Sequence, residues 1–205
     1  MKNDGITLEE FWGVVTSLKN DASRCSKALA ATPEEDEAGR AFWRRMYARA
    51  AFAFFDGVTY RMAYHAYMAR DRRGVAFSLE ELNRLEKMFD FDDDEDLDIY
   101  SAVSHINMLE DMKFAFNAFA RVHYTDYVLP IADADWVFMK EAAHIRNWLT
   151  HPKTAEGLEV NGGDVDALAW GMVWFVENLV ALLGSSLTHT LTTFAGWDDE
   201  DDAVM

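Results

Sequence analysis

The sequence has few of the residues that interrupt helices or cross-link chains. It contains one cysteine, Cys25, and therefore cannot form an internal disulfide. Its only prolines are Pro33, Pro130 and Pro152, and 11 of its 205 residues are glycine. Because proline and glycine interrupt helices most strongly, their scarcity leaves room for long helices. We expect Cys25, which lies in a helical pattern, to be a half-buried and unreactive thiol.

The sequence also lacks the apolar segments that target a chain to a membrane. Its first residues, MKNDGITLEE, contain no apolar core of a secretory signal. The longest apolar stretch, residues 168–183, is interrupted by Glu177 and Asn178. It is shorter than the roughly 20 apolar residues that span a bilayer. We therefore expect no membrane partner and a cytoplasmic location.

Positive charge is scarce overall, and the formal net charge is −17. Three segments account for nearly all of this net negative charge: residues 34–37 carry −4, residues 90–98 carry −7 and residues 198–202 carry −5. Residues 40–73 instead carry eight arginines against two aspartates. Net charge governs solubility and steering, so it does not exclude a local site for anions. We interpret the acidic runs as solvated loops and a disordered tail over 198–205, which leaves residues 1–197 as one domain.

Hydrophobic periodicity predicts helices along the whole chain. Apolar residues recur at threes and fours, as at Phe42, Met46 and Ala50, and no strand pattern or internal repeat is present. We expect Gly57, in mid-helix, to mark a close contact between two helices. The expected fold class is all-α, an up-and-down bundle of four to five helices with an extra N-terminal helix. The predicted helices span about 7–31, 34–72, 79–89, 97–123, 133 or 135 to 149, and 164–187.

The last predicted helix is apolar on nearly every side. It begins after Asp164, which we expect to cap its N-terminus, and it carries tryptophans at 170 and 174 among many aliphatic residues. A helix without a polar face is either central in its domain or covered by a second subunit. This helix is therefore the natural surface for a dimer.

The sharpest functional signal is the segment RNWLTHP at residues 146–152. Residues five apart on a regular helix point about 140° away from each other, so Arg146 and His151 would lie on different faces. Pro152 ends the helix, which allows His151 to turn back toward its last turn. A permanently charged guanidinium, a titratable imidazole and the amide of Asn147 would then form a group that can bind phosphate and move protons.

This segment resembles the Arg-x4-His motif of HEPN domains, the "higher eukaryote and prokaryote nucleotide-binding" helical bundles. In that motif a polar residue follows the arginine, as Asn147 does here, and the motif lies at the end of a bundle helix. Residues 50–60, AAFAFFDGVTY, also look like an early helix of bacterial members. The resemblance covers about residues 38–187.

The resemblance implies a metal-independent endoribonuclease without a cofactor, with a role in toxin–antitoxin systems or antiviral defence against phage. Such a hydrolase acts as a homodimer in which two motifs share one composite site. His151 would be the general acid and base for attack of the ribose 2′-OH, Arg146 would bind the scissile phosphate, and Asn147 would orient the pair. The implied partners are RNA and an antitoxin or other regulatory protein.

One position departs from a subfamily of this motif. That subfamily carries Arg-x4-His-x-Tyr, and its tyrosine is modified by a nucleotidyltransferase antitoxin. Here Lys153 stands at the corresponding position. Regulation by tyrosine modification is therefore not expected, and Lys153 is either an RNA-binding residue or a solvated loop lysine.

A structural interpretation of the same residues stays open. Arg146 could pair with Glu141 or Glu177, and His151 could stabilise the C-terminus of its helix, where a cation is favoured. The chain would then be a non-catalytic HEPN bundle that binds a nucleotide or a protein partner.

Metal sites are not expected. Glu141-x-x-His144 has the ligand spacing of di-metal carboxylate bundles, but the chain lacks the second such motif that those sites need. We therefore expect His144 at an interface or in the core. The acidic run at 90–98 lacks the glycine and the closing glutamate of an EF-hand loop.

Overall fold

The computed structural model describes residues 8–88, 107–154 and 158–195. In these ranges every regular element is a helix, which confirms the all-α class. The helices are α1 (Leu8–Ala31), α2 (Glu37–Arg73), α3 (Leu79–Lys87), α5 (Met108–Val122), α6 (Trp136–Thr150) and α7 (Gly162–Ala195).

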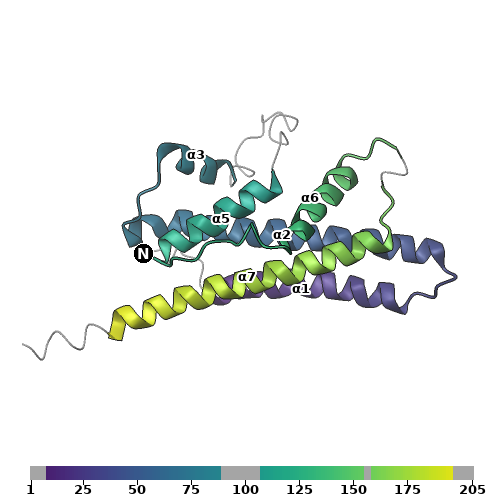
Figure 1. Cartoon of the computed structure of the whole chain (residues 1–205), viewed down its shortest axis with the longest axis horizontal. Coiled ribbons are helices and arrows are strands. Elements are labelled where there is room, and N and C mark those ends of the chain that lie inside the picture. The colour runs from purple at the N-terminus through teal and green to yellow at the C-terminus, as the bar shows by residue number, and fades with distance from the viewer. Residues whose placement is uncertain (1–7, 89–106, 155–157, 196–205) are drawn as a thin grey trace, which may run out of the picture.

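Helix α2 runs through the middle of the molecule (Figure 1). It packs against α1, α5, α7 and α3, whereas α6 packs chiefly against α7. In the view of Figure 1, α1 and α7 lie below α2, α3 lies above it, and α5 runs obliquely across it. The helices are therefore gathered around one long helix, with the contact between α6 and α7 as a second junction.

Four phenylalanines form the centre of the core. Phe54 and Phe55 of α2, Phe116 of α5 and Phe175 of α7 are all buried. The ring centroid of Phe175 lies 5.5 Å from that of Phe54, 5.4 Å from that of Phe55 and 5.6 Å from that of Phe116, each in an edge-on arrangement. Aromatic pairs favour this geometry, so the cluster ties three helices together.

Helix α1 belongs to the same core and is not an appended element. Its residues Phe11, Val15 and Ala22 are buried in the main cluster. The close contact expected at Gly57 is present, because a Cβ atom there would lie 2.6 Å from Cδ1 of Leu18. The missing side chain thus lets α1 and α2 approach each other.

Several helix bounds differ from the predicted ones. Helix α2 begins at Glu37 because the Asp36 carboxylate accepts the Gly39 N–H at 2.9 Å. Helix α7 begins at Gly162, and the expectation that Asp164 caps it is wrong. The Asn161 side chain accepts the Asp164 N–H at 3.1 Å, and the Asp164 carboxylate accepts the Asn161 N–H at 2.8 Å. Helix α7 also continues to Ala195, beyond the predicted end at residue 187.

Some predictions fall outside the described residues. These are the acidic runs at 90–98 and 198–202, the first part of the helix predicted over 97–123, and the disordered tail over 198–205. Within the described ranges, one segment, Gly162–Thr188 of α7, is long and apolar enough to cross a membrane by length and composition, and 44% of its 18-residue apolar window is buried in the fold.

Candidate functional site at the end of α6

The segment 146–151 forms the last turn of α6 and its cap. The N–H of His151 still donates to the carbonyl of Asn147 at 3.2 Å, and the Thr150 hydroxyl donates to the carbonyl of Arg146 at 2.8 Å. His151 then leaves the helix, with φ −127° and ψ 58°. Pro152 accounts for this end, because a residue before proline is disfavoured in the α region.

The guanidinium of Arg146 makes an ion pair with Asp56 of α2. Its Nε and Nη2 atoms donate to Oδ2 of Asp56 at 3.3 and 3.1 Å, and the Arg146 side chain is 18% exposed. Neither Glu141 nor Glu177, the partners considered from the sequence, pairs with it in the described part of the chain. Nη1 of Arg146 has no hydrogen bond to any described residue and keeps its capacity to donate.

Asp56 connects this pair to a larger group of charges. Burial raises the pKa of the Asp56 carboxyl, Arg146 lowers it, and the nearby Asp111 of α5 raises it. Asp111 in turn accepts a hydrogen bond from Arg84 of α3 at 2.8 Å. The two ion pairs thus bring together charges from α6, α2, α5 and α3.

Three of the four predicted site residues are exposed at this end of α6. Asn147, His151 and Lys153 are all open to solvent, and their side chains make no hydrogen bond or ion pair with the described residues. Arg146 instead contacts α2, and no hydrogen bond joins it to His151. The structure therefore gathers the four residues on one helix end without joining the guanidinium directly to the imidazole.

Trp148 and His144 form the neighbouring part of α6. His144 is exposed and therefore lies outside the core, which leaves the interface position as the prediction, and its ring packs edge-on against Trp148 with centroids 5.1 Å apart. The indole Nε1 of Trp148 is buried and has no acceptor among the described residues. In those residues no group of three or more His, Cys, Asp or Glu gathers as a metal site would require.

A second histidine pair lies elsewhere in the fold. Nε2 of His65 on α2 lies 3.0 Å from Nε2 of His123 at the end of α5, with the rings nearly parallel. Burial lowers the pKa of both imidazoles, and the nearby His65 and Arg73 lower that of His123 further, to about 4. The sequence alone leaves four further residues open as neighbours of the motif or as packing residues: His65, His105, Tyr60 and Tyr64. His65 pairs with His123, Tyr60 and Tyr64 stack on each other, and His105 lies outside the described residues.

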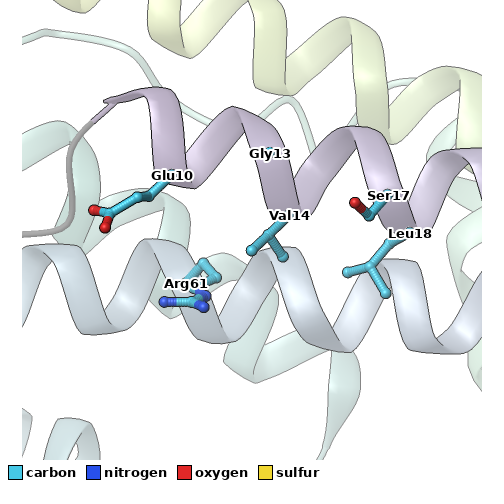
Figure 2. A pocket seen from close by; sticks show the side chains of 6 residues that line it. All are labelled: Glu10, Gly13, Val14, Ser17, Leu18 and Arg61. Carbon is cyan, nitrogen blue, oxygen red and sulfur yellow. The ribbon is translucent and has the colours of Figure 1, made fainter.

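Two grooves run along α1 and α2. Figure 2 shows the first, of about 450 Å³, lined by Glu10, Gly13, Val14, Ser17, Leu18 and Arg61. The second, of about 410 Å³, includes Cys25, a free and half-buried thiol as expected, whose pKa is raised by burial. None of the lining residues belongs to α6, so neither groove is part of the candidate site.

Sequence periodicity did not identify Asp56 as a site residue. Its signal was present, because it is a carboxylate between the buried Phe55 and Val58 on the apolar face of α2. A carboxylate among buried apolar residues favours a charged partner, and the pattern alone does not say which arginine supplies it.

Comparisons with known proteins give no relative for this chain: no family model, no curated protein and no solved structure matches it.

Proposed function

We propose that this protein is an endoribonuclease of HEPN type that cleaves RNA without a metal ion, in toxin–antitoxin or antiviral defence. One observation supports the proposal most. A solvent-exposed imidazole, His151, caps the same helix end that carries the exposed amide of Asn147 and the anchored guanidinium of Arg146. This helix end supplies a group that can move protons and one that can bind phosphate.

The proposed reaction is transfer of the RNA phosphate to the neighbouring 2′-oxygen. His151 removes the proton of the ribose 2′-OH, and the oxygen attacks phosphorus. The bond from phosphorus to the 5′-oxygen breaks, and that oxygen takes up a proton from a protonated histidine. The products carry a 2′,3′-cyclic phosphate and a 5′-OH. Arg146 stabilises the charge on the phosphate oxygens, which is the role of a preorganised cation.

Asp56 has a positioning role in this proposal. It holds Nε and Nη2 of Arg146, so Nη1 is the part of the guanidinium left for a phosphate oxygen. The ion pair also reduces the net charge that Arg146 offers to RNA. The resemblance adds a second protomer whose motif completes the site, and Lys153, exposed beyond the cap, is placed to contact the RNA backbone.

A second candidate function is a non-catalytic bundle that binds a nucleotide or a protein partner. The ion pair between Arg146 and Asp56 favours it, because it gives Arg146 a structural partner within the fold. In that case Arg146 contributes to the packing of α6 on α2, and His151 is a helix cap.

RNA cleavage in the presence of EDTA tests the proposal. Wild-type protein is incubated with several RNAs beside His151→Ala, Arg146→Ala and, as a matched control, His144→Ala, which removes another exposed histidine of α6. We expect cleavage by wild type and His144→Ala, and a loss of at least about 100-fold in His151→Ala, the lower end of the range for a general acid–base. The 3′ ends should carry a cyclic phosphate.

The opposite outcomes are equally informative. No cleavage by folded wild-type protein contradicts the ribonuclease, and fluorescence anisotropy with labelled RNA and nucleotides then tests the binding function. Equal losses in His144→Ala and His151→Ala would show that the activity does not depend on this motif. An Asp56→Asn variant separates positioning from chemistry, since it should reduce kcat while the pH dependence set by His151 is kept.

A further inference from the structure

The exposed face of α7 carries apolar side chains at a regular spacing. Trp170 is 58% exposed, Val173 46%, Val180 54% and Leu187 55%. The exposed Glu177 and Gly184 lie on the same face. Together the six residues are spaced alternately three and four positions apart along the helix: Trp170, Val173, Glu177, Val180, Gly184 and Leu187. We call these six residues the α7 seam. A repeat of this kind is the pattern by which two helices pack side by side.

The seam is distinct from the face of α7 that enters the core. The buried face includes Phe175, Leu179 and Leu182, which are completely buried. Since the core already covers that face, the seam is a second apolar surface on the same helix. Glu177 is its only charged member, and Figure 1 shows that the C-terminal end of α7 extends past the neighbouring helices.

We propose that the α7 seam binds the α7 seam of a second copy of this chain in antiparallel orientation. A symmetric pairing about the midpoint between residues 178 and 179 places Trp170 opposite Leu187 of the second copy. Val173 lies opposite Gly184, and Glu177 lies opposite Val180. Large residues then face smaller ones, and the two glutamates are offset. Gly162 lies opposite Ala195, so the helices overlap over their full length.

The parallel orientation is less favourable for the same residues. It would place Glu177 against Glu177, which is a repulsion between like charges, and Gly184 against Gly184, which leaves a gap in the packing. A Cβ built on Gly184 meets nothing within 4 Å in the protomer, so this position is open to an incoming side chain. The sequence of the seam therefore selects the antiparallel pair.

An exposed apolar helix face can also bind a membrane surface instead of a second protein chain. Helices that lie on membranes are rich in Lys and Arg along their polar edge, and α7 contains neither. Asp166 and Glu177 are exposed on α7 instead, and the chain carries a net charge of −17. Anionic lipid headgroups would repel such a surface. A second copy of the chain fits it better.

The pairing also determines where the C-terminal ends of α6 in the two copies lie relative to each other. At a rise of about 1.5 Å per residue, the two N-termini of α7 would be roughly 50 Å apart. Figure 1 shows the C-terminal end of α6 at the same end of the molecule as the start of α7. The seam is thus a different contact from one in which two motifs face each other. It is inferred from α7 alone and does not depend on the proposed RNA cleavage.

Sedimentation equilibrium tests the seam. We expect wild type to reach a larger mass than Val173→Glu and Val180→Glu, because each variant places a charge inside the seam contact. Any pairing through the α6 motif is a separate contact and is retained in all variants. Val128→Glu, a matched change at an exposed valine of the loop before α6, should keep the wild-type mass. Circular dichroism reports whether each variant keeps its helices. A monomeric wild type at about 100 μM, or a Val180→Glu variant with the wild-type mass, would overturn the proposal.

Disulfide trapping tests the orientation. In a Cys25→Ser background, Val173→Cys and Gly184→Cys proteins are mixed and oxidised. The antiparallel pair predicts a disulfide between the two different variants and little self-linking of Val173→Cys. Self-linked Val173→Cys would instead indicate a parallel pair and overturn the proposed orientation. A monomeric wild type that co-sediments with lipid vesicles would assign the seam to a membrane surface.

Discussion

His65 of α2 and His123 at the end of α5 share one hydrogen bond in a half-buried part of the fold. With their Nε2 atoms 3.0 Å apart, one imidazole donates and the other accepts, which requires the accepting ring to be neutral. The ring of Phe119 packs against both, and Arg73 adds positive charge nearby. Each of these surroundings disfavours the protonated form, in agreement with the lowered pKa values.

This pair predicts a loss of stability in mild acid. In the unfolded chain the histidines bind protons below their ordinary pKa, near 6.5, whereas folded His123 does so only near 4. The unfolded state therefore binds more protons in this window, and the free energy of unfolding falls as pH drops from about 7 to about 4. We expect a decrease on the order of 2 kcal/mol, below the full linkage value because the pair is partly solvent-exposed.

Urea unfolding followed by circular dichroism at a series of pH values measures this effect. The double variant His65→Leu/His123→Leu removes both partners at once and should flatten the slope between pH 7 and 4.5. His144→Ala, which removes an exposed histidine, should leave it unchanged. An equally steep slope in the double variant would mean that other groups cause the acid sensitivity.

For single residues, the sequence predicted positions along the chain better than it predicted the side chains that contact them from other helices. The end of α6 at Pro152 was predicted, and with it the position of Asn147, His151 and Lys153 on one exposed helix end. The partner of Arg146 was not predicted, because Asp56 lies 90 residues away and periodicity carries no information on pairing between helices. The same holds for His65 and His123, which are 58 residues apart. The catalytic roles themselves stay predictions.

At the scale of elements, caps and turns explain most of the agreement. Ser78 and Glu81 form a capping box at the start of α3, close to the predicted start at residue 79, and Gly74 ends α2 in the left-handed region with φ 65°. The start of α7 was misplaced because Asn161 and Asp164 cap it reciprocally, so the aspartate three residues inside the helix looks like the cap. Past residue 187, α7 continues through four threonines, which lower helix propensity without stopping a helix.

The contact between α6 and α7 gives a prediction for Gly171. A Cβ at this position would lie 3.3 Å from Sδ of Met139 and 3.5 Å from the carbonyl oxygen of Phe138. Met139 is completely buried and the carbonyl belongs to the α6 backbone, so neither has room to move away. We expect Gly171→Val to lower the free energy of unfolding by about 2 kcal/mol, the usual cost of overpacking.

A glycine without neighbours provides the control. Gly13 of α1 has nothing within 4 Å of a built Cβ, so Gly13→Ala should raise the free energy of unfolding by up to about 1 kcal/mol through helix propensity. Both values come from urea denaturation. A neutral Gly171→Val would show that α6 and α7 are less closely packed than described.

At the scale of the whole molecule, self-association links stability to concentration. If the folded protomer pairs through the α7 seam, mass action stabilises the folded state as protein concentration rises. We expect the Tm of wild type to rise measurably between about 1 and 100 μM, and the Tm of Val180→Glu to rise less because the seam contact is lost. Differential scanning calorimetry at both ends of this range measures the shift. A wild-type Tm that is independent of concentration would contradict the pairing.

The aromatic cluster around Phe175 has a consequence for the order in which the protein folds. Helices α1 and α2 are adjacent in sequence and pack extensively, so they can associate while the chain is still being synthesised. The ring that joins Phe54, Phe55 and Phe116 comes more than 50 residues after the last of them. Until the ribosome has released α7, those three rings lack their common partner. The growing chain therefore presents an aromatic surface that chaperones bind, and the final helix removes it.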